Sequence, residues 1–148
     1  MSKVYIIVYD GANVLIGQGG NSGNPSTARQ GYHLPGGTYF TGTAEDAAIR
    51  ELLEETGIKK EAIRIEHNNI TSDQTRGVIF VLARTESVEG LVAGFVRPPV
   101  KNPHDEPFRS IISVSAENLA DNDNFSAKFC TDWFAHGLRA AQDLMKQK

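Results

Sequence analysis

The chain has 148 residues, of which 40% are hydrophobic and 22% charged, and its formal net charge is −3. This length suits one compact domain over residues 1–148, and the apolar share is too high for a disordered chain. No apolar run approaches the roughly 18 residues that cross a bilayer, so we expect no membrane partner. A mildly acidic chain without a basic stripe is also not expected to form a stable nucleic acid complex.

Cysteine use indicates the compartment. Cys130 is the only cysteine, which excludes an internal disulfide and a multi-cysteine zinc site. The first apolar run, residues 4–9, is too short for the core of a signal peptide. We therefore expect a location in a reducing cytoplasm.

The first third of the chain predicts short strands separated by turns. Residues 3–9 are rich in β-branched and aromatic side chains and predict a strand. Asp10-Gly11 is a turn signal, and residues 14–16 predict the returning strand of a hairpin. Residues 17–30 form a long, glycine-rich polar loop of a kind that is often functional. Residues 32–40 have strand-like ends around a Pro-Gly-Gly sequence.

A helix is predicted over residues 44–56. Thr43 is placed to cap its first turn, with Asp46 three residues later in a pattern like a capping box. Gly57 stands where glycine ends a helix.

The second half of the chain predicts further strands and one long helix. Strands are expected at 63–65, 78–83 and 109–115, and a short helical turn at 116–119. Residues 86–107 contain two glycines and four prolines, so we predict mostly loop there.

Apolar residues at steps of one, three and four predict an amphipathic helix over 126–147. Cys130 and Trp133 lie on its apolar stripe and are expected in the core. The order of strands and helices predicts an α/β domain with a mixed sheet between helices.

Three glutamates gather on one side of the predicted helix 44–56. At about 100° per residue from Arg50, Glu54 falls near 40°, Glu51 near 100° and Glu55 near 140°. The remaining positions of this stretch fall on the opposite side, at about 200–300°: Ile49, Leu52, Leu53 and Thr56. The spacing therefore predicts an acidic face opposite an aliphatic one.

Two interpretations of this acidic face stay open on spacing alone. A solvated face is the usual outcome of a charge run. Clustered carboxylates also ligate hard cations such as Mg²⁺ and Mn²⁺. The upstream pair Gly36-Gly37 favours the metal site, because glycines let the backbone approach a ligand closely. Arg50 lies one turn before Glu54 and is expected to pair with it.

Residues 36–58 resemble the Nudix box, G-x5-E-x7-R-E-U-x-E-E-x-G-U, in which U is aliphatic. Gly36 fits the first position, and RELLEETGI at residues 50–58 fits the whole ending. One position departs, because the expected glutamate is replaced by Gly42. A one-residue deletion would make Gly37, rather than Gly36, the glycine of the box.

The resemblance implies a Nudix-type α/β/α sandwich and a MutT-like, metal-dependent pyrophosphohydrolase. Such an enzyme cleaves a nucleoside diphosphate linked to another group, and a nucleoside triphosphate or nucleotide sugar is favoured here by elimination. The implied cofactor is Mg²⁺ or Mn²⁺, and the implied partners are a nucleotide-derived small molecule and a second copy in a homodimer.

The resemblance also implies roles for individual residues. Metal ligands are expected to be Glu51, Glu54, Glu55 and the carbonyl of Gly37 (or Gly36), with Glu51 as either a ligand or the base. Arg50 is expected to hold the glutamates through ion pairs. The catalytic set is completed by Glu106 as an extra ligand or base, against the alternative of an ordinary loop charge.

Other interpretations follow from the missing glutamate and from ordinary surface chemistry. A Nudix module that binds or senses a nucleotide with weak or no turnover is one, and an interaction domain with a solvated acidic helix is another. His33 is interpreted as structural rather than as a substrate contact. Three arginines are interpreted as surface charges rather than phosphate contacts: Arg29, Arg76 and Arg97.

Overall fold

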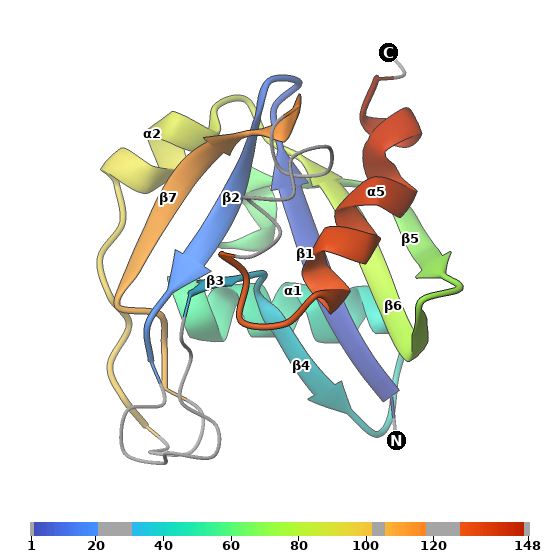
Figure 1. Cartoon of the computed structure of the whole chain (residues 1–148). Helices are drawn as coiled ribbons and strands as arrows, with labels where there is room; N and C mark the ends of the chain where they lie inside the picture. The colour runs from blue at the N-terminus through green and yellow to red at the C-terminus, as the bar shows by residue number, and fades with distance from the viewer. Residues whose placement is uncertain (1, 21–30, 102–105, 118–127, 147–148) are drawn as a thin grey trace.

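A mixed β-sheet forms the centre of the computed structural model, which describes residues 2–20, 31–101, 106–117 and 128–146 (Figure 1). Within these ranges the sheet has seven strands. They are β1 (Ser2–Tyr9), β2 (Asn13–Gln18), β3 (Tyr32–His33), β4 (Gly36–Tyr39), β5 (Arg64–Ser72), β6 (Thr75–Arg84) and β7 (Ser110–Ser115).

The strand order is β3-β2-β1-β6-β5, with β4 also on β1 and β7 also on β2. β1 and β6 are parallel and the other pairs antiparallel, which confirms the predicted mixed sheet. β6 occupies one edge of β1 from Lys3 to Tyr9. The other edge is shared, since β4 pairs with residues 2–5 and β2 with Tyr9. β2 and β4 therefore pair with opposite ends of the same edge of β1.

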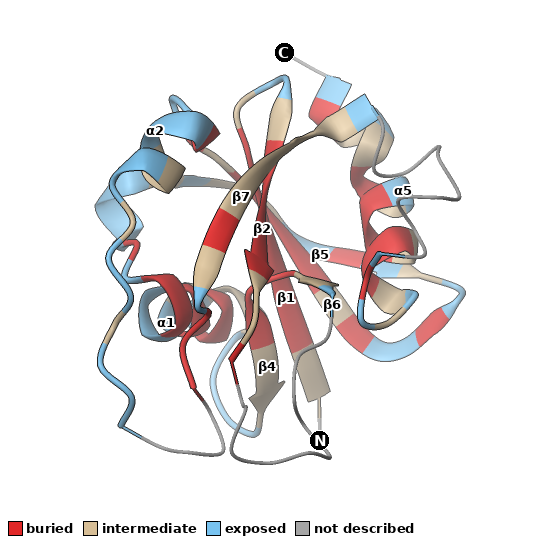
Figure 2. Cartoon of the chain, turned by 60° about the vertical axis from the view of Figure 1, so that its left-hand side comes forward, coloured by how far each residue is buried: buried red, intermediate tan, exposed pale blue. Residues whose placement is uncertain are grey.

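Helices cover both faces of the sheet, and this confirms the α/β/α sandwich (Figures 1 and 2). Side chains of β1 alternate between the faces, as the two-residue period of a strand requires. Val4, Ile6 and Val8 pack in one cluster with α1 (Ala44–Thr56) and α2 (Val88–Ala93). Tyr5, Ile7 and Tyr9 pack in the other with α5 (Trp133–Lys146). The 3-10 helix η1 (Lys60–Ala62) precedes β5.

Helix α1 begins and ends where its caps predict. Thr43 Oγ1 accepts a hydrogen bond from the Asp46 amide at 3.1 Å. Gly57 adopts the left-handed conformation, φ +77°, and its amide donates to the Leu53 carbonyl. These local contacts fix the helix that carries the three glutamates.

Among the described residues the C-terminal helix begins at Trp133, later than predicted, because residues 128–130 bond to β3 instead. Residues 126, 127 and 147 of the predicted helix lie outside the described residues. The Tyr32 amide donates to the Lys128 carbonyl at 2.7 Å, and the Cys130 amide donates to the Tyr32 carbonyl at 2.9 Å. These backbone groups are therefore not available for helical bonds. The expectation for the core was wrong for Cys130, which is exposed, whereas Trp133 is half-buried.

Two other predictions were incomplete. Residues 86–107 contain the short helix α2, capped by Ser87, whose Oγ accepts from the Gly90 amide at 3.0 Å. The strands expected at 63–65 and 78–83 are the ends of a longer hairpin, β5–β6. The polar residues of β5 concealed its length, because β5 is the last strand in the order and much of it is exposed.

A polar cluster joins the ends of three strands. The Tyr9 hydroxyl donates to Glu66 Oε1, and Arg84 Nη2 donates to the Tyr9 oxygen at 2.9 Å. Glu66 Oε2 also pairs with Arg64 Nη2 at 3.0 Å and with Arg84 Nε at 3.3 Å. Burial alone would raise the pKa of the Glu66 carboxyl, but these hydrogen bonds and the Arg84 charge outweigh it and lower the pKa. The cluster connects β1, β5 and β6.

Replacing Glu66 with Gln is expected to lower the free energy of unfolding at neutral pH by about 1–2 kcal/mol, because Tyr9 and Arg84 lose a charged acceptor. A lowered folded pKa contributes stability above the ordinary value of 4.5, and that stability is lost as pH falls through the folded pKa. Urea unfolding from about pH 6 to pH 3 should thus show a smaller acid loss for Glu66→Gln than for wild type. Glu61→Gln, an exposed position on η1, is the control, and equal acid losses in all three proteins would contradict the assignment.

Candidate active site on helix α1

Two of the three Nudix-box glutamates are buried. Glu51 and Glu55 are only 6% and 1% exposed, whereas the Glu54 side chain is 49% exposed. Leu53, predicted on the aliphatic side, is 47% exposed. The prediction of an acidic face opposite an aliphatic one was therefore wrong. The helix turns Glu51 and Glu55 inward together with its small and aliphatic residues, so the interpretation of a wholly solvated acidic face is also wrong.

The glycine pair of β4 lies directly beside these buried carboxylates. The Gly36 amide donates to Glu55 Oε1 at 2.6 Å. A Cβ placed on Gly37 would lie 3.4 Å from Cδ and Oε1 of Glu51. Close approach of the backbone, expected from the sequence, is thus observed at both glycines. Gly36 supports Glu55, and Gly37 borders Glu51.

Arg50 pairs with two of the three glutamates. Its Nη2 lies 3.6 Å from Glu51 Oε1, and its Nε lies 3.8 Å from Glu54 Oε1. The expected pair between Arg50 and Glu54 is therefore present. Both side chains of that pair are half exposed, so it adds little to stability and acts mainly on side-chain orientation.

Glu106 is buried close to the same helix. The Phe108 amide, two residues later, donates to the backbone carbonyl of Glu55 at 3.1 Å. Arg97 Nη2 lies 3.3 Å from Glu106 Oε2 and also donates to the Pro107 carbonyl at 3.2 Å. Arg97, interpreted as a surface charge, instead orients Glu106. No local pattern predicts this pair, because the partners stand nine residues apart in a stretch predicted as loop.

Several other sequence candidates are also located. The ring of His33 packs among Tyr5, Phe108 and Phe134, with centroid separations of 4.6–5.8 Å, and its Nδ1 contacts the Leu34 carbonyl. This packing agrees with a structural role for His33. Arg76 is exposed on β6. Arg29 lies outside the described residues.

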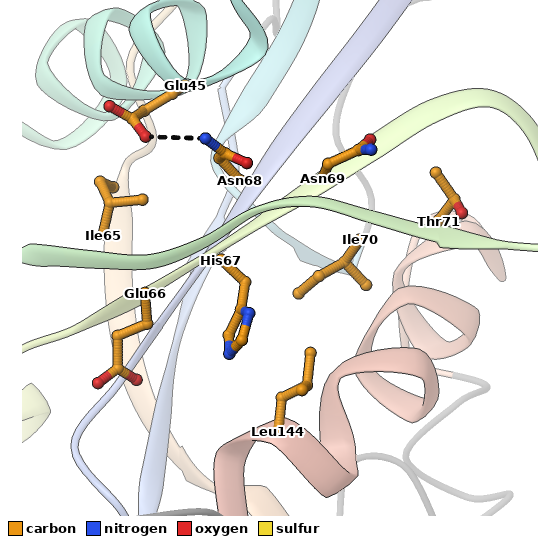
Figure 3. A pocket seen from close by; sticks show the side chains of 9 residues that line it. All are labelled: Glu45, Ile65, Glu66, His67, Asn68, Asn69, Ile70, Thr71 and Leu144. Carbon is orange, nitrogen blue, oxygen red and sulfur yellow. Dashed lines mark hydrogen bonds between the residues drawn. The ribbon is translucent and has the colours of Figure 1, made fainter.

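Glu45 does not replace the missing box glutamate. Its Oε1 accepts a hydrogen bond from Asn68 Nδ2 at 3.4 Å (Figure 3). It lines a cleft of about 520 Å³ along β5, together with residues 65–71 and Leu144. Position 42 itself is exposed, and Gly42 adopts φ +81°.

The oxygen atoms of the three glutamates and of the β4 glycines are of the type that binds hard cations, but they do not converge on one position. Carboxylate and carbonyl oxygens are the ligands that Mg²⁺ and Mn²⁺ prefer, and buried carboxylates require compensation of their charge. Among the described side chains, no three acidic, histidine or cysteine groups lie close enough to hold one ion. The residues fit a metal by the chemistry of their oxygens, and Gly37 leaves space against the Glu51 carboxylate.

Comparison with known proteins decides the family. A family model of the NUDIX domain matches residues 1–133. The chain belongs to the Nudix family. This Nudix protein is therefore a hydrolase of the class that acts on phosphoric anhydride bonds. A comparison with curated proteins gave no match.

Solved structures of similar fold cover almost the whole Nudix chain. RenU, a Nudix hydrolase from M. smegmatis, is 14% identical with a TM-score of 0.69, over 99% of this chain and 87% of its own. An ADP-ribose pyrophosphatase from Streptococcus suis is 14% identical with a TM-score of 0.61, over 99% and 92%. An Ap4A hydrolase from C. elegans is 17% identical with a TM-score of 0.58, over 97% and 98%. At these identities the likeness shows the fold alone. No helix among the described residues is long and apolar enough to cross a membrane.

Proposed function

We propose that this Nudix protein is a metal-dependent pyrophosphohydrolase that cleaves a nucleoside diphosphate linked to another group, as in a nucleoside triphosphate or a nucleotide sugar. The observation that supports this most is the pair of buried carboxylates, Glu51 and Glu55, held against the glycines of β4. An acidic helix that served only solubility would expose these side chains, since burying a carboxylate costs free energy.

In this proposal the oxygens that would hold Mg²⁺ or Mn²⁺ ions belong to Glu51, Glu54, Glu55 and the carbonyl of Gly37. When bound, the cation supplies positive charge to the phosphoryl oxygens of the substrate, whose charge would otherwise be repelled by the glutamates. The backbone amide of Gly36 holds the Glu55 carboxylate by a hydrogen bond to Oε1.

The remaining proposed roles belong to side chains beside α1. Glu51 acts as a metal ligand or as the base that accepts a proton from the attacking water. Arg50 is a positioning residue, because its ion pairs reach Glu51 and Glu54. Glu106 is the proposed extra ligand or base, and Arg97 would position its carboxylate.

A hydrolysis screen tests the proposal. Purified protein is incubated with nucleoside triphosphates, nucleotide sugars, ADP-ribose and dinucleoside polyphosphates, with Mg²⁺, with Mn²⁺ and with a chelator. The last two substrates are included because structurally similar proteins are named an ADP-ribose pyrophosphatase and an Ap4A hydrolase. We expect release of phosphate, pyrophosphate or a nucleotide in the metal samples alone. Thermal stabilisation by a nucleotide without product would favour the alternative, a binding or sensor module.

Replacing Gly42 with Glu is not expected to raise turnover by more than about twofold. A Cβ there has no heavy atom within 4 Å, but the left-handed φ of +81° costs an L residue about 1–2 kcal/mol. Gly42→Asn is the control, because asparagine tolerates this conformation without adding a carboxylate. Initial rates and urea unfolding of both variants check this, and a large rate gain confined to Gly42→Glu would show that the missing carboxylate damps catalysis.

The proposal takes residues 1–148 as one domain in a reducing cytoplasm, where the single Cys130 would stay a thiol. The homodimer that the resemblance implies also remains a prediction, and sedimentation of the purified chain tests it. Neither expectation affects the assignment of residues on α1.

A further inference from the structure

We propose that a cleft at the β1–β2 hairpin is a second binding site, for a small ligand that carries a phosphate on a flat, apolar body. The cleft has a volume of about 570 Å³, within the range of small-molecule sites. The hairpin, the ends of β6 and β7, and the last turns of α5 form its walls (Figure 1). Its lining combines apolar and polar groups: Tyr9, Ala12, Asn13, Arg84, Ser115 and Met145.

This hairpin cleft lies away from the Nudix-box glutamates. Gly37, which borders Glu51, pairs with Val4 on β1. Tyr9 is five residues further along the same strand, a distance of about 16 Å at 3.3 Å per residue. A ligand in the cleft would therefore leave the site on α1 open.

Arg84 is the group that would receive the phosphate. Its Nε and Nη2 bind Glu66 and the Tyr9 hydroxyl, and its guanidinium carbon lies 4.6 Å from the centre of the Tyr9 ring. The third nitrogen, Nη1, faces the hairpin, where a Cβ placed on Gly11 would lie 3.6 Å away. Among the described residues Nη1 has no hydrogen-bond partner. The guanidinium is thus held in place with one edge turned to the cleft.

The charge balance favours an anion. Arg64 and Arg84 share the single carboxylate of Glu66, so these three side chains carry one net positive charge. The Asp10 carboxylate of the same hairpin is bound by three backbone amides instead. Burial and the hydrogen bond to Glu66 raise the pKa of the Tyr9 hydroxyl, which keeps it neutral. Lys146 and Glu117 also line the cleft and offset each other. A positive centre in a chain of net charge −3 is a local attraction for phosphate.

Hydrogen bonds hold the hairpin that forms one wall of the cleft. Asp10 Oδ1 accepts from the Ala12 and Asn13 amides at 3.0 and 2.8 Å, and its Oδ2 accepts from the Val88 amide at 2.9 Å. The Ala116 amide donates to the Ala12 carbonyl at 2.9 Å. The side-chain amide of Asn13 and the hydroxyl of Ser115 also line the cleft and would meet the polar edge of a flat ligand.

A titration monitored by amide NMR tests the proposal, with AMP, adenosine and inorganic phosphate as probes. AMP has no phosphoric anhydride bond, so the result does not depend on hydrolysis. We expect AMP to shift the amides of Gly11, Asn13 and Ser115, and to bind at least about tenfold more tightly than adenosine. Shifts confined to Gly36 and Gly37, or equal affinity for adenosine, would overturn the proposal whether or not the Nudix site is active.

Two variants make this test specific. Ala12→Trp fills the cleft and should abolish the AMP shifts, whereas Ala93→Trp, at an exposed position on α2, should keep them. Lys146→Glu reverses a charge of the lining without touching the hairpin and should weaken AMP at least about threefold but leave adenosine unchanged. AMP affinity equal to wild type in both Ala12→Trp and Lys146→Glu would overturn the proposed site. If Ala12→Trp does not fold, unchanged AMP affinity in Lys146→Glu alone would overturn it.

Discussion

Glu54→Gln is expected to reduce hydrolysis at least about 100-fold while leaving the fold intact. The substitution removes a charge but keeps the shape of the side chain. Glu54 is half exposed, and its ion pair with Arg50 is a surface pair, so the free energy of unfolding should change by less than about 0.5 kcal/mol. A loss of kcat with unchanged stability would support a role for the carboxylate in holding the cation.

Glu45→Gln is the matched control for this experiment, because it neutralises a glutamate of the same helix outside the box. Glu45 accepts a hydrogen bond from Asn68 and is outside the proposed metal set. Glu45→Gln should therefore leave the hydrolysis rate within about twofold of wild type. Rates are compared at saturating Mg²⁺ and at saturating Mn²⁺, with urea unfolding of each protein. Turnover retained in Glu54→Gln would remove this residue from the proposed metal set, and an equal loss in both variants would point to a general effect of helix charge.

Local signals were sufficient to predict helix α1 and insufficient to predict its orientation. Thr43 and Gly57 predict both ends of α1, because caps depend on contacts within a few residues. Which side of the helix faces the sheet depends on packing against β4 and Phe108, which is distant in sequence. Helical angles therefore group Glu51 and Glu54 correctly as neighbours, but do not reveal that one is buried and the other exposed.

Long-range bonds account for the other differences. The Tyr9 hydroxyl reaches Glu66 across 57 positions and Arg84 across 75, and no spacing rule connects them. The apolar stripe of the last helix was read correctly from Trp133 onward. Its predicted start was wrong because the backbone near Lys128 bonds to Tyr32, almost one hundred residues earlier. An apolar periodicity indicates which residues are buried but not that they are helical. Phe129 is buried because it lies in this bridge, outside the helix.

The two glycines of β4 are expected to fail in different ways when each is replaced with alanine. A Cβ on Gly36 would lie 2.1 Å from the Val4 carbonyl oxygen, and its φ of +153° disfavours an L side chain. The obstructing atom is backbone of the central strand, so it has no room to move. Gly36→Ala should therefore cost at least about 3 kcal/mol, a large share of the stability of a typical domain.

Gly37→Ala should leave the free energy of unfolding within about 1 kcal/mol of wild type, because its Cβ would make only ordinary contact, 3.4 Å from the Glu51 carboxylate. The added methyl nevertheless occupies the space where the proposed cation meets Glu51. We expect kcat to fall at least about tenfold, since small displacements of a catalytic group are costly. Urea unfolding and initial rates of both variants give the comparison.

Full activity in Gly37→Ala would exclude the space beside Glu51 as part of the metal site. It would also favour Gly36, rather than Gly37, as the first glycine of the Nudix box. Near-normal stability in Gly36→Ala would contradict the packing of β4 against β1. If both expectations hold, the two glycines have separate roles. Gly36 allows β4 to pack closely against β1, and its amide binds the buried Glu55 carboxylate. Gly37 leaves space beside the Glu51 carboxylate.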